Sequence, residues 1–217
     1  YTEITFDLRK GHKWSDGKAF TADDVAFWAN DIINNKEIHK ETPFPWSIGM
    51  KAEKIDETTV KLIFEKPYPA LLEYLSGIGS YFTPYANMQF LSPMHIKYNP
   101  EADKEAKAAG YDDWVARFGV YFNKWKDAVV AKPEGIKVPT LESHLMIDID
   151  TQRRIYVVNP YYFKIDSSGQ QLPYIEGMNE RFLDKELWPI ETANGNLDFK
   201  AQNMPVPDFP VLKESEE

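Results

Sequence analysis

The chain has 217 residues, no cysteine and a formal net charge of −9, with 43% hydrophobic and 14% aromatic residues. This length and apolar content provide a core for one large domain or two small ones. The acidic balance, with no stretch of basic residues among aromatics, argues against nucleic-acid binding. The lack of cysteine excludes disulfides, thiolate metal ligands and a cysteine nucleophile.

The first third predicts a strand, a turn and a capped helix. Apolar and polar residues alternate over residues 4–8, which is the pattern of a half-buried strand. Ser15-Asp16-Gly17 predicts a turn. Thr21 and Asp24 have the spacing of a capping box, and the apolar residues that follow, as far as Ile32, lie on one helical face.

A second strand is predicted further along. Residues 35–51 are interpreted as a loop, and residues 60–64 alternate again. The prolines at the end of the 66–69 segment stop this strand, because proline cannot donate to a ladder. We place a boundary between segments at 66–75. Residues 71–91, which are apolar and aromatic with scattered Gly and Pro, are interpreted as a short helix followed by a loop.

Two helices, three strands and a last helix complete the pattern. Residues 102–109 predict a short polar helix that Gly110 ends. An amphipathic helix over 112–131 carries an aromatic stripe that we expect to pack in the core: Trp114, Phe118, Phe122, Trp125 and Val129. Later segments predict strands at 145–149, 154–158 and 174–182 and a helix at 185–193, with Pro189 in its first turn or the helix starting later. The fold class is therefore mixed α/β (α+β).

The sequence singles out no catalytic or metal site. The four histidines lack helix-borne ligand spacing, so they are expected to be ordinary surface or loop residues: His12, His39, His95 and His144. Asp148 and Asp150 lack the rest of a calcium loop. The many acidic residues leave a glycosidase-like carboxylate pair open without indicating one. We predict no catalytic residue, no cofactor and no metal.

Residues 5–25 carry a specific phrase, TFDLRKGHKWSDGKAFTADDV. It resembles the signature of the family 5 extracellular solute-binding proteins, which are the peptide, nickel and oligosaccharide receptors of ABC importers. The family phrase ends a strand with "LR" and continues "KWSDG", "PFTA" and "DV". This chain departs from it by Ala19, where proline is common.

A second block resembles one branch of the same family. Residues 159–166 and 169–175, NPYYFKID and GQQLPYI, are similar to its "NPYYWKVDT" and "GNQLPYID" phrases. Residues 195–199 resemble its "GEIDF" strand start, and residues 54–60 and 66–69 resemble its "AIDD-TV" and "KPYP" segments. These matches occur in the order of the family, so the resemblance spans nearly the whole chain.

The resemblance implies part of a type II periplasmic-binding-protein fold: one lobe plus a small domain, with mixed sheets and flanking helices. Residues 1–70 would be most of the small inserted domain and 71–217 the middle segment of the first large lobe, with the second lobe and both natural termini absent. Trp14 and Trp28 would lie in the core. The Asn159-Pro160-Tyr161-Tyr162 motif would hold the fold without contacting ligand.

The implied function is that of the substrate-binding component of an ABC transporter. It would capture an oligosaccharide or an oligopeptide outside the cell membrane, in the periplasm or anchored by lipid, and deliver it to a membrane permease. Aromatic richness and the second block favour sugar oligomers. The ligand-binding candidates, each of which has internal packing as its alternative, are Trp46, Tyr81, Phe82, Tyr85 and Asn87.

Two other functions remain open, and the implied fold has a consequence for the behaviour of the chain alone. A carbohydrate-active enzyme would need two carboxylates facing one cleft, and a ligand sensor would use the same fold to feed a regulator. Because a single lobe leaves exposed sheet edges and apolar surface, we expect the 217-residue chain alone to bind ligand weakly or not at all. We also expect it to self-associate.

Overall fold

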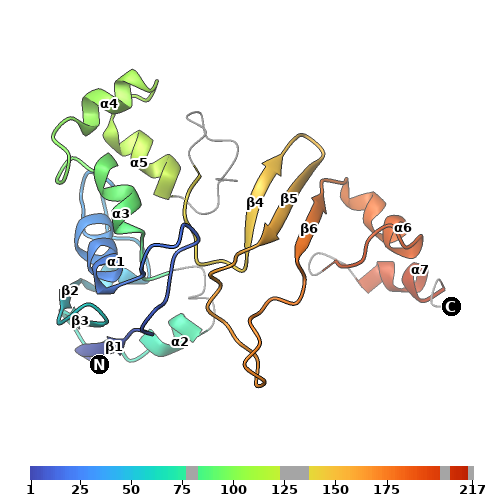
Figure 1. Ribbon diagram of the computed structural model, residues 1–217, viewed down its shortest axis with the longest axis horizontal. Helices are drawn as coiled ribbons and strands as arrows, with labels where there is room; N and C mark the ends of the chain where they lie inside the picture. The colour runs from blue at the N-terminus through green and yellow to red at the C-terminus, as the bar shows by residue number, and fades with distance from the viewer. Residues whose placement is uncertain (77–82, 123–136, 201–205, 215–217) are drawn as a thin grey trace.

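The computed structural model describes residues 1–76, 83–122, 137–200 and 206–214. Figure 1 shows a three-stranded sheet with most of the helices beside it, a second three-stranded sheet, and a pair of helices beyond that sheet. The mixed α/β fold class is confirmed. Among the described residues, no helix has the length and apolar character needed to cross a bilayer.

The first sheet contains β1 (Glu3–Asp7), β2 (Met50–Lys54) and β3 (Thr59–Phe64), all antiparallel, in the order β1-β3-β2. The predicted strands at 4–8 and 60–64 are confirmed. Strand β2 was not predicted, and the expected loop at 35–51 was wrong at its end. Only Met50 and Ala52 alternate as buried residues there, which is too short a pattern to recognise.

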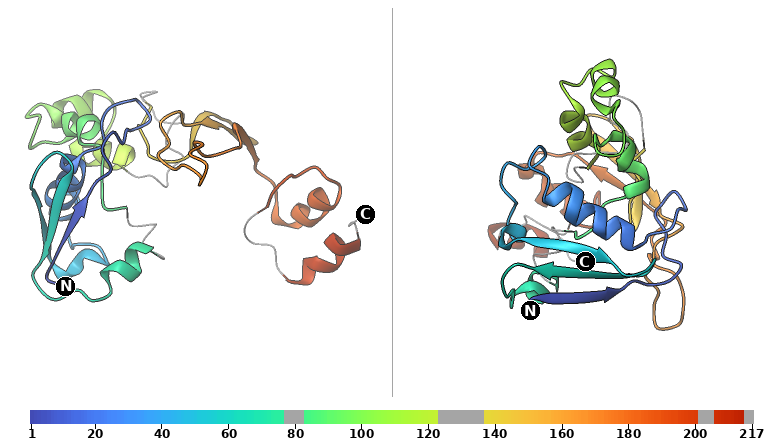
Figure 2. Two further views of the ribbon diagram at one scale, coloured as in Figure 1. Left: turned by 60° about the horizontal axis from the view of Figure 1, so that its bottom comes forward. Right: turned by 90° about the vertical axis from the view of Figure 1, so that its left-hand side faces the viewer.

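A capped helix covers one face of this sheet. Helix α1 (Ala22–Phe27) begins at Thr21, whose hydroxyl accepts from Asp23 N at 3.3 Å, while the Asp24 carboxylate accepts from Thr21 N at 2.9 Å. The predicted capping box is therefore confirmed. The helix continues as a π-helical segment, η1 (Trp28–Ile33), and α1 and η1 lie across the sheet (Figure 2).

The next part of the chain is helical. A 3₁₀ turn, η2 (Trp46–Ile48), precedes β2. The helical elements that follow β3 are α2 (Leu71–Ser76), α3 (Met88–Leu91), η4 (Ser92–Met94), α4 (Ala102–Ala108) and α5 (Trp114–Phe122). Gly110, with φ of +89°, follows α4 as predicted. Of the helix expected at 112–131, residues 123–131, with Trp125 and Val129, lie outside the described residues.

One hydrophobic core unites these elements. Trp14 and Trp28 are 4% and 2% exposed, as the resemblance implied, and Phe118 and Leu141 belong to the same cluster. The rings of Phe27 and Phe118 are 6.4 Å apart. Core side chains therefore lie on both sides of residue 70, and the division into domains at 1–70 and 71–217 remains a prediction.

The second sheet is much less buried. Strands β4 (His144–Ile149), β5 (Arg153–Val158) and β6 (Gly177–Arg181) pair antiparallel in chain order, with a bulge between Met146 and Asp148. These strands confirm the three predicted ones. Met146 is the one buried residue in their described side chains, and every residue of β6 is exposed.

Two short helical units end the described chain: η5 (Lys185–Leu187) with α6 (Trp188–Ala193), and η6 (Val206–Asp208) with α7 (Phe209–Glu214). Pro189 lies in the first turn of α6, so the predicted helix does begin later, after a 3₁₀ turn. Helix α7 was not predicted; Pro210 occupies its first turn, where proline is tolerated.

Candidate functional site

The two sequence blocks that resemble the family meet in space. The Arg9 guanidinium donates a hydrogen bond to the backbone carbonyl of Phe163 and lies over its ring, 5.9 Å from the centroid. The His12 ring packs between Phe20 and Phe163, with centroid distances of 4.9 and 4.7 Å. We call this contact, between residues 9–17 and residues 159–163, the motif joint.

Further contacts tighten the motif joint. Lys13 Nζ lies 5.3 Å from the centre of the Tyr161 ring, within the range of a cation–π interaction. Gly17 has φ of +83°, and a Cβ there would lie 3.1 Å from the Tyr161 hydroxyl oxygen, so this turn requires glycine. Ser15 N donates to Thr140 O, and Thr140 N donates to Ser15 Oγ, both at 3.0 Å.

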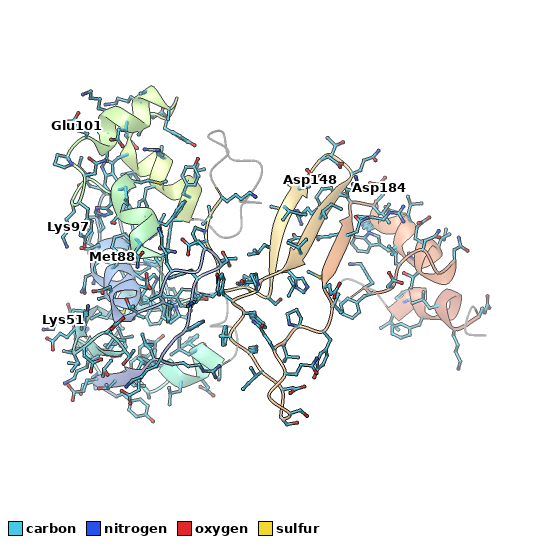
Figure 3. The ribbon with its side chains drawn as sticks, viewed as in Figure 1. Lys51, Met88, Lys97, Glu101, Asp148 and Asp184 are labelled. Atoms are coloured by element: carbon cyan, nitrogen blue, oxygen red, sulfur yellow. The ribbon has the colours of Figure 1, made fainter. Side chains whose placement is uncertain are left out.

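Asp24 joins the first block to the helical layer. Its Oδ2 accepts from Trp14 Nε1 at 3.1 Å and from Thr21 N at 2.9 Å, and its Oδ1 accepts from Met88 N at 2.8 Å. Met88 lies beside α1, at the start of α3 (Figure 3). Burial raises the pKa of the Asp24 carboxyl, and the three N–H donors oppose that rise. Sequence reasoning assigned Asp24 only its helix-capping bond.

Asn159 fixes the turn that opens the second block. It is fully buried, its Nδ2 donates to Glu142 O at 2.9 Å, and its Oδ1 accepts from Tyr161 N at 3.0 Å. Its own backbone N–H donates to Ser143 O at 2.9 Å. The expectation that this motif holds the fold is confirmed for Asn159, whereas Tyr161 is 40% exposed.

Two cavities flank the motif joint, each with a volume of about 220 Å³. His12 and Phe163 contribute to the walls of both. The apolar cavity is lined by Phe6, Leu8, His12, Phe20, Val25, Val60, Leu62, Pro84, Tyr85, Leu141 and Phe163. The basic cavity is lined by Arg9, Lys10, Gly11, His12, Lys13, Tyr161, Tyr162, Phe163 and Gln171.

The structure places two of the predicted ligand residues inside the protein. Trp46 is 2% exposed, and its ring packs edge-on against Trp28 at 4.8 Å. Asn87 is 4% exposed and caps α3 by accepting from Phe90 N at 2.9 Å. Its buried Nδ2 has no partner in the described part of the chain.

Tyr85 is the predicted ligand residue that lines a cavity. Its ring packs edge-on against Trp14 and Phe20, at 5.9 and 5.5 Å, and burial raises its pKa to about 12. The phenol is therefore a neutral hydrogen-bonding group at any physiological pH. Tyr81 and Phe82 lie outside the described residues, and ligand contact by all five candidates stays a prediction.

His95 lies in a loop, which the expectation for the histidines allowed, but it is not a surface residue. His95 is 1% exposed and belongs to the core, with its ring 4.6 Å from that of Trp114. Its Nδ1 accepts from Lys97 N at 3.1 Å, and its Nε2 lies 3.0 Å from Asp31 O. The signal that could have found it is its position between the apolar residues Met94 and Ile96.

An ion pair with one buried partner adjoins His95. Asp31 is 8% exposed, pairs with the Lys97 ammonium group and accepts from the Tyr98 hydroxyl at 2.5 Å. The hydrogen bond to Asp31 is the main cause that raises the pKa of Lys97. No group of three or more metal-ligating side chains occurs within the described ranges. The contacts of Asp31 with Lys97 and Tyr98 link η1 to the segment that follows η4.

Comparison with known proteins agrees with the two sequence blocks. A family model described as "Bacterial extracellular solute-binding proteins, family 5 Middle" matches residues 1–217. The chain is 31% identical over 205 residues to a probable ABC transporter-binding protein of Deinococcus radiodurans. That alignment covers 90% of this chain and 30% of the relative.

Two further proteins are similar to the chain. A periplasmic alpha-galactoside-binding protein of Rhizobium meliloti is 30% identical over 211 residues, which cover 94% of this chain and 27% of the relative. The solved oligopeptide-binding protein OppA is 32% identical, with a TM-score of 0.82 over 99% of this chain and 34% of its own. The chain thus spans about a third of the length of these proteins.

These similarities confirm the type II periplasmic-binding-protein fold that the sequence predicted. The family consists of solute-binding proteins. Its description includes the word extracellular, and the name of the Rhizobium relative includes the word periplasmic. Because the family model covers every residue, the chain belongs to the family 5 bacterial extracellular solute-binding proteins.

Proposed function

We propose that this chain is part of the substrate-binding component of an ABC transporter. The whole protein would capture an oligosaccharide or oligopeptide outside the cytoplasmic membrane, free in the periplasm or anchored by lipid, and deliver it to a membrane permease. The observation that carries the proposal is the match of the family model to residues 1–217. The ABC transporter-binding relative supports it.

Sugar oligomers are the proposed ligand class, with oligopeptides as the second candidate. The alpha-galactoside-binding relative favours the first, and the OppA similarity favours the second. Aromatic rings provide apolar faces on which sugar rings stack. Of the predicted contacts, we retain Tyr85 with Tyr81 and Phe82 as the main proposal, since the burial of Trp46 and Asn87 favours internal packing.

Calorimetric titration of the full-length protein tests the ligand class. We expect binding of α-galactosides or of manno-, cello- or xylo-oligomers, and little heat from oligopeptides of mixed sequence. Binding of peptides alone would overturn the sugar assignment and leave the transport role intact. Tyr85→Phe serves as the matched variant, because it removes the hydroxyl and keeps the packed ring.

A binding role without catalysis is part of the proposal. Asp148 and Asp184, which Figure 3 labels at the outer end of the second sheet, come from different elements and line neither cavity. We expect no reducing ends to be released from any bound oligosaccharide. If product were formed and mutation of a single carboxylate abolished it, the result would support a hydrolase. If the gene for this protein lay beside a regulator gene and not beside a permease gene, that would support a sensor.

The isolated 217-residue chain should bind the ligand of the whole protein weakly. Its second sheet leaves three large apolar side chains exposed in its strands: Ile147, Val157 and Met178. Such surface favours association between molecules. Light scattering should therefore show self-association, and an affinity equal to that of the full-length protein would contradict the proposal that the cleft needs residues beyond this chain.

A further inference from the structure

The basic cavity at the motif joint has an unusual charge for this protein. The chain carries a net charge of −9, yet Arg9, Lys10 and Lys13 all line this one cavity of about 220 Å³. Among the described residues that line it there is no carboxylate. Three cations that face the same space repel one another unless an anion compensates them.

The nearby acidic side chains have other partners. Asp16 pairs with Lys18 at 3.7 Å, and Asp7 accepts from the Thr59 hydroxyl at 3.4 Å. Asp166 accepts from the Tyr174 hydroxyl at 2.6 Å and from Ser168 N at 2.8 Å. These carboxylates are thus held by other groups, and none of them lines the cavity.

The three cations also have no ion pair in the part of the chain that the structure describes. The Arg9 guanidinium is held in place by the carbonyl of Phe163, and Lys13 lies over the Tyr161 ring. Arg9 is thus fixed by the fold, while Lys10 is exposed and lines the cavity. This arrangement presents positive charge on a rigid base.

The remaining walls suit a ring-shaped molecule. Tyr161, Tyr162 and Phe163 provide aromatic surface, and Gln171 provides a side-chain amide that is anchored to Pro160 O at 3.0 Å and Tyr162 O at 2.8 Å. A cavity of roughly 150 Å³ is enough for benzene, so this one has room for a single ring with a charged substituent. Carboxylate and phosphate groups are the anions that Arg and Lys recognise.

We propose that the basic cavity, formed by Arg9, Lys10, Lys13, Tyr161 and Tyr162, binds a small organic acid of one ring through its carboxylate or phosphate group. This site is independent of the transported ligand. The anionic group of the organic acid would be attracted by the lysines, and the ring of the acid would lie against the tyrosines. Because the walls come from both sequence blocks, an occupied site would also strengthen the motif joint.

The test is a titration of the protein with benzoate, and with benzyl alcohol as the neutral ring of the same shape. Backbone amide shifts at Gly11 and side-chain amide shifts at Gln171 locate the site in NMR spectra. We expect saturable shifts with benzoate, none with benzyl alcohol, and an affinity that falls as sodium chloride is raised. Galacturonate and inorganic phosphate distinguish a ring carboxylate from a free oxyanion.

The double variant Lys10→Met, Lys13→Met should weaken benzoate binding by roughly tenfold or more, because two of the three cations are lost. The matched control, Lys51→Met with Lys104→Met, changes the net charge equally at exposed lysines that lie elsewhere and have carboxylate partners. Equal shifts with benzyl alcohol, unchanged affinity in the cavity variant, or a response to acidic peptides with none to benzoate would overturn the proposal.

Discussion

The two sheets of this protein differ sharply in what covers them. The β1-β3-β2 sheet packs under α1 and η1 and shares one core with α5 and Leu141. The β4-β5-β6 sheet has Met146 as the one buried residue in its described strands. The described residues therefore supply the first sheet with a hydrophobic core, and they leave most of the second sheet uncovered.

The largest expected effect tests the first half of that comparison. Phe118→Ala removes a fully buried ring that packs against Phe27 and His95. It should lower the free energy of unfolding by about 3–5 kcal/mol. Phe199→Ala, at a ring that is 83% exposed, should change it by less than ~0.5 kcal/mol. Urea unfolding followed by fluorescence measures both, and similar values would contradict the difference between the two regions.

The next effect concerns the carboxylate that links the two parts of the first core. Asp24→Ala leaves the N–H groups of Trp14, Thr21 and Met88 without their acceptor. Since each such loss costs about 1–3 kcal/mol, we expect a destabilisation of about 3 kcal/mol or more in the same urea experiment. Asp23→Ala, in the same helical turn but at a partly exposed side chain, is the control; an equal loss there would show that only the helix dipole matters.

A smaller effect should sharpen the role of the motif joint. Gly17→Ala places a Cβ against the Tyr161 hydroxyl at a residue with φ of +83°. The backbone strain is about 1–2 kcal/mol, and hydrogen exchange should increase in β4, β5 and β6 more than in β1, β2 and β3. Gly110→Ala is the control, because it has φ of +89° but nothing near its Cβ. Faster exchange in both sheets alike would argue that the joint does not support the second sheet.

The smallest expected effect is a dependence on pH. Burial lowers the pKa of His95 and of His12. The unfolded chain therefore binds more protons than the folded one once the pH falls below about 6.5, the usual value for histidine, so stability should decrease towards acid. The midpoint of urea unfolding at pH 5.5 should lie below that at pH 7.5. His95→Gln should reduce this difference, and a larger difference in that variant would contradict the assignment.

Much of the fold could be predicted because local patterns and long-range packing agree. Val60, Leu62 and Phe64 alternate, and all three are buried. Thr21 and Asp24 have capping-box spacing and form both bonds. Strand β2 could not be predicted, because its burial comes from contact with η1 and β3 and its own sequence has only two alternating apolar residues.

The site was less accessible from the sequence. Trp46 stands in a proline-rich segment that favours an exposed loop, yet Trp28, eighteen positions earlier, provides the packing surface that buries it. The basic cavity depends on residues 9–13 meeting residues 161–171. Neither segment alone has an anion-binding pattern, so only the folded chain reveals the cluster.

The hydrogen bond from Met88 N to Asp24 joins residues 64 positions apart in the chain. During synthesis, the strand, turn and helix of the first block are made before Met88, so the bond from Met88 N to the Asp24 carboxylate can form only later. The N-terminal segment should therefore remain open until residue 88 and the helices after it have emerged.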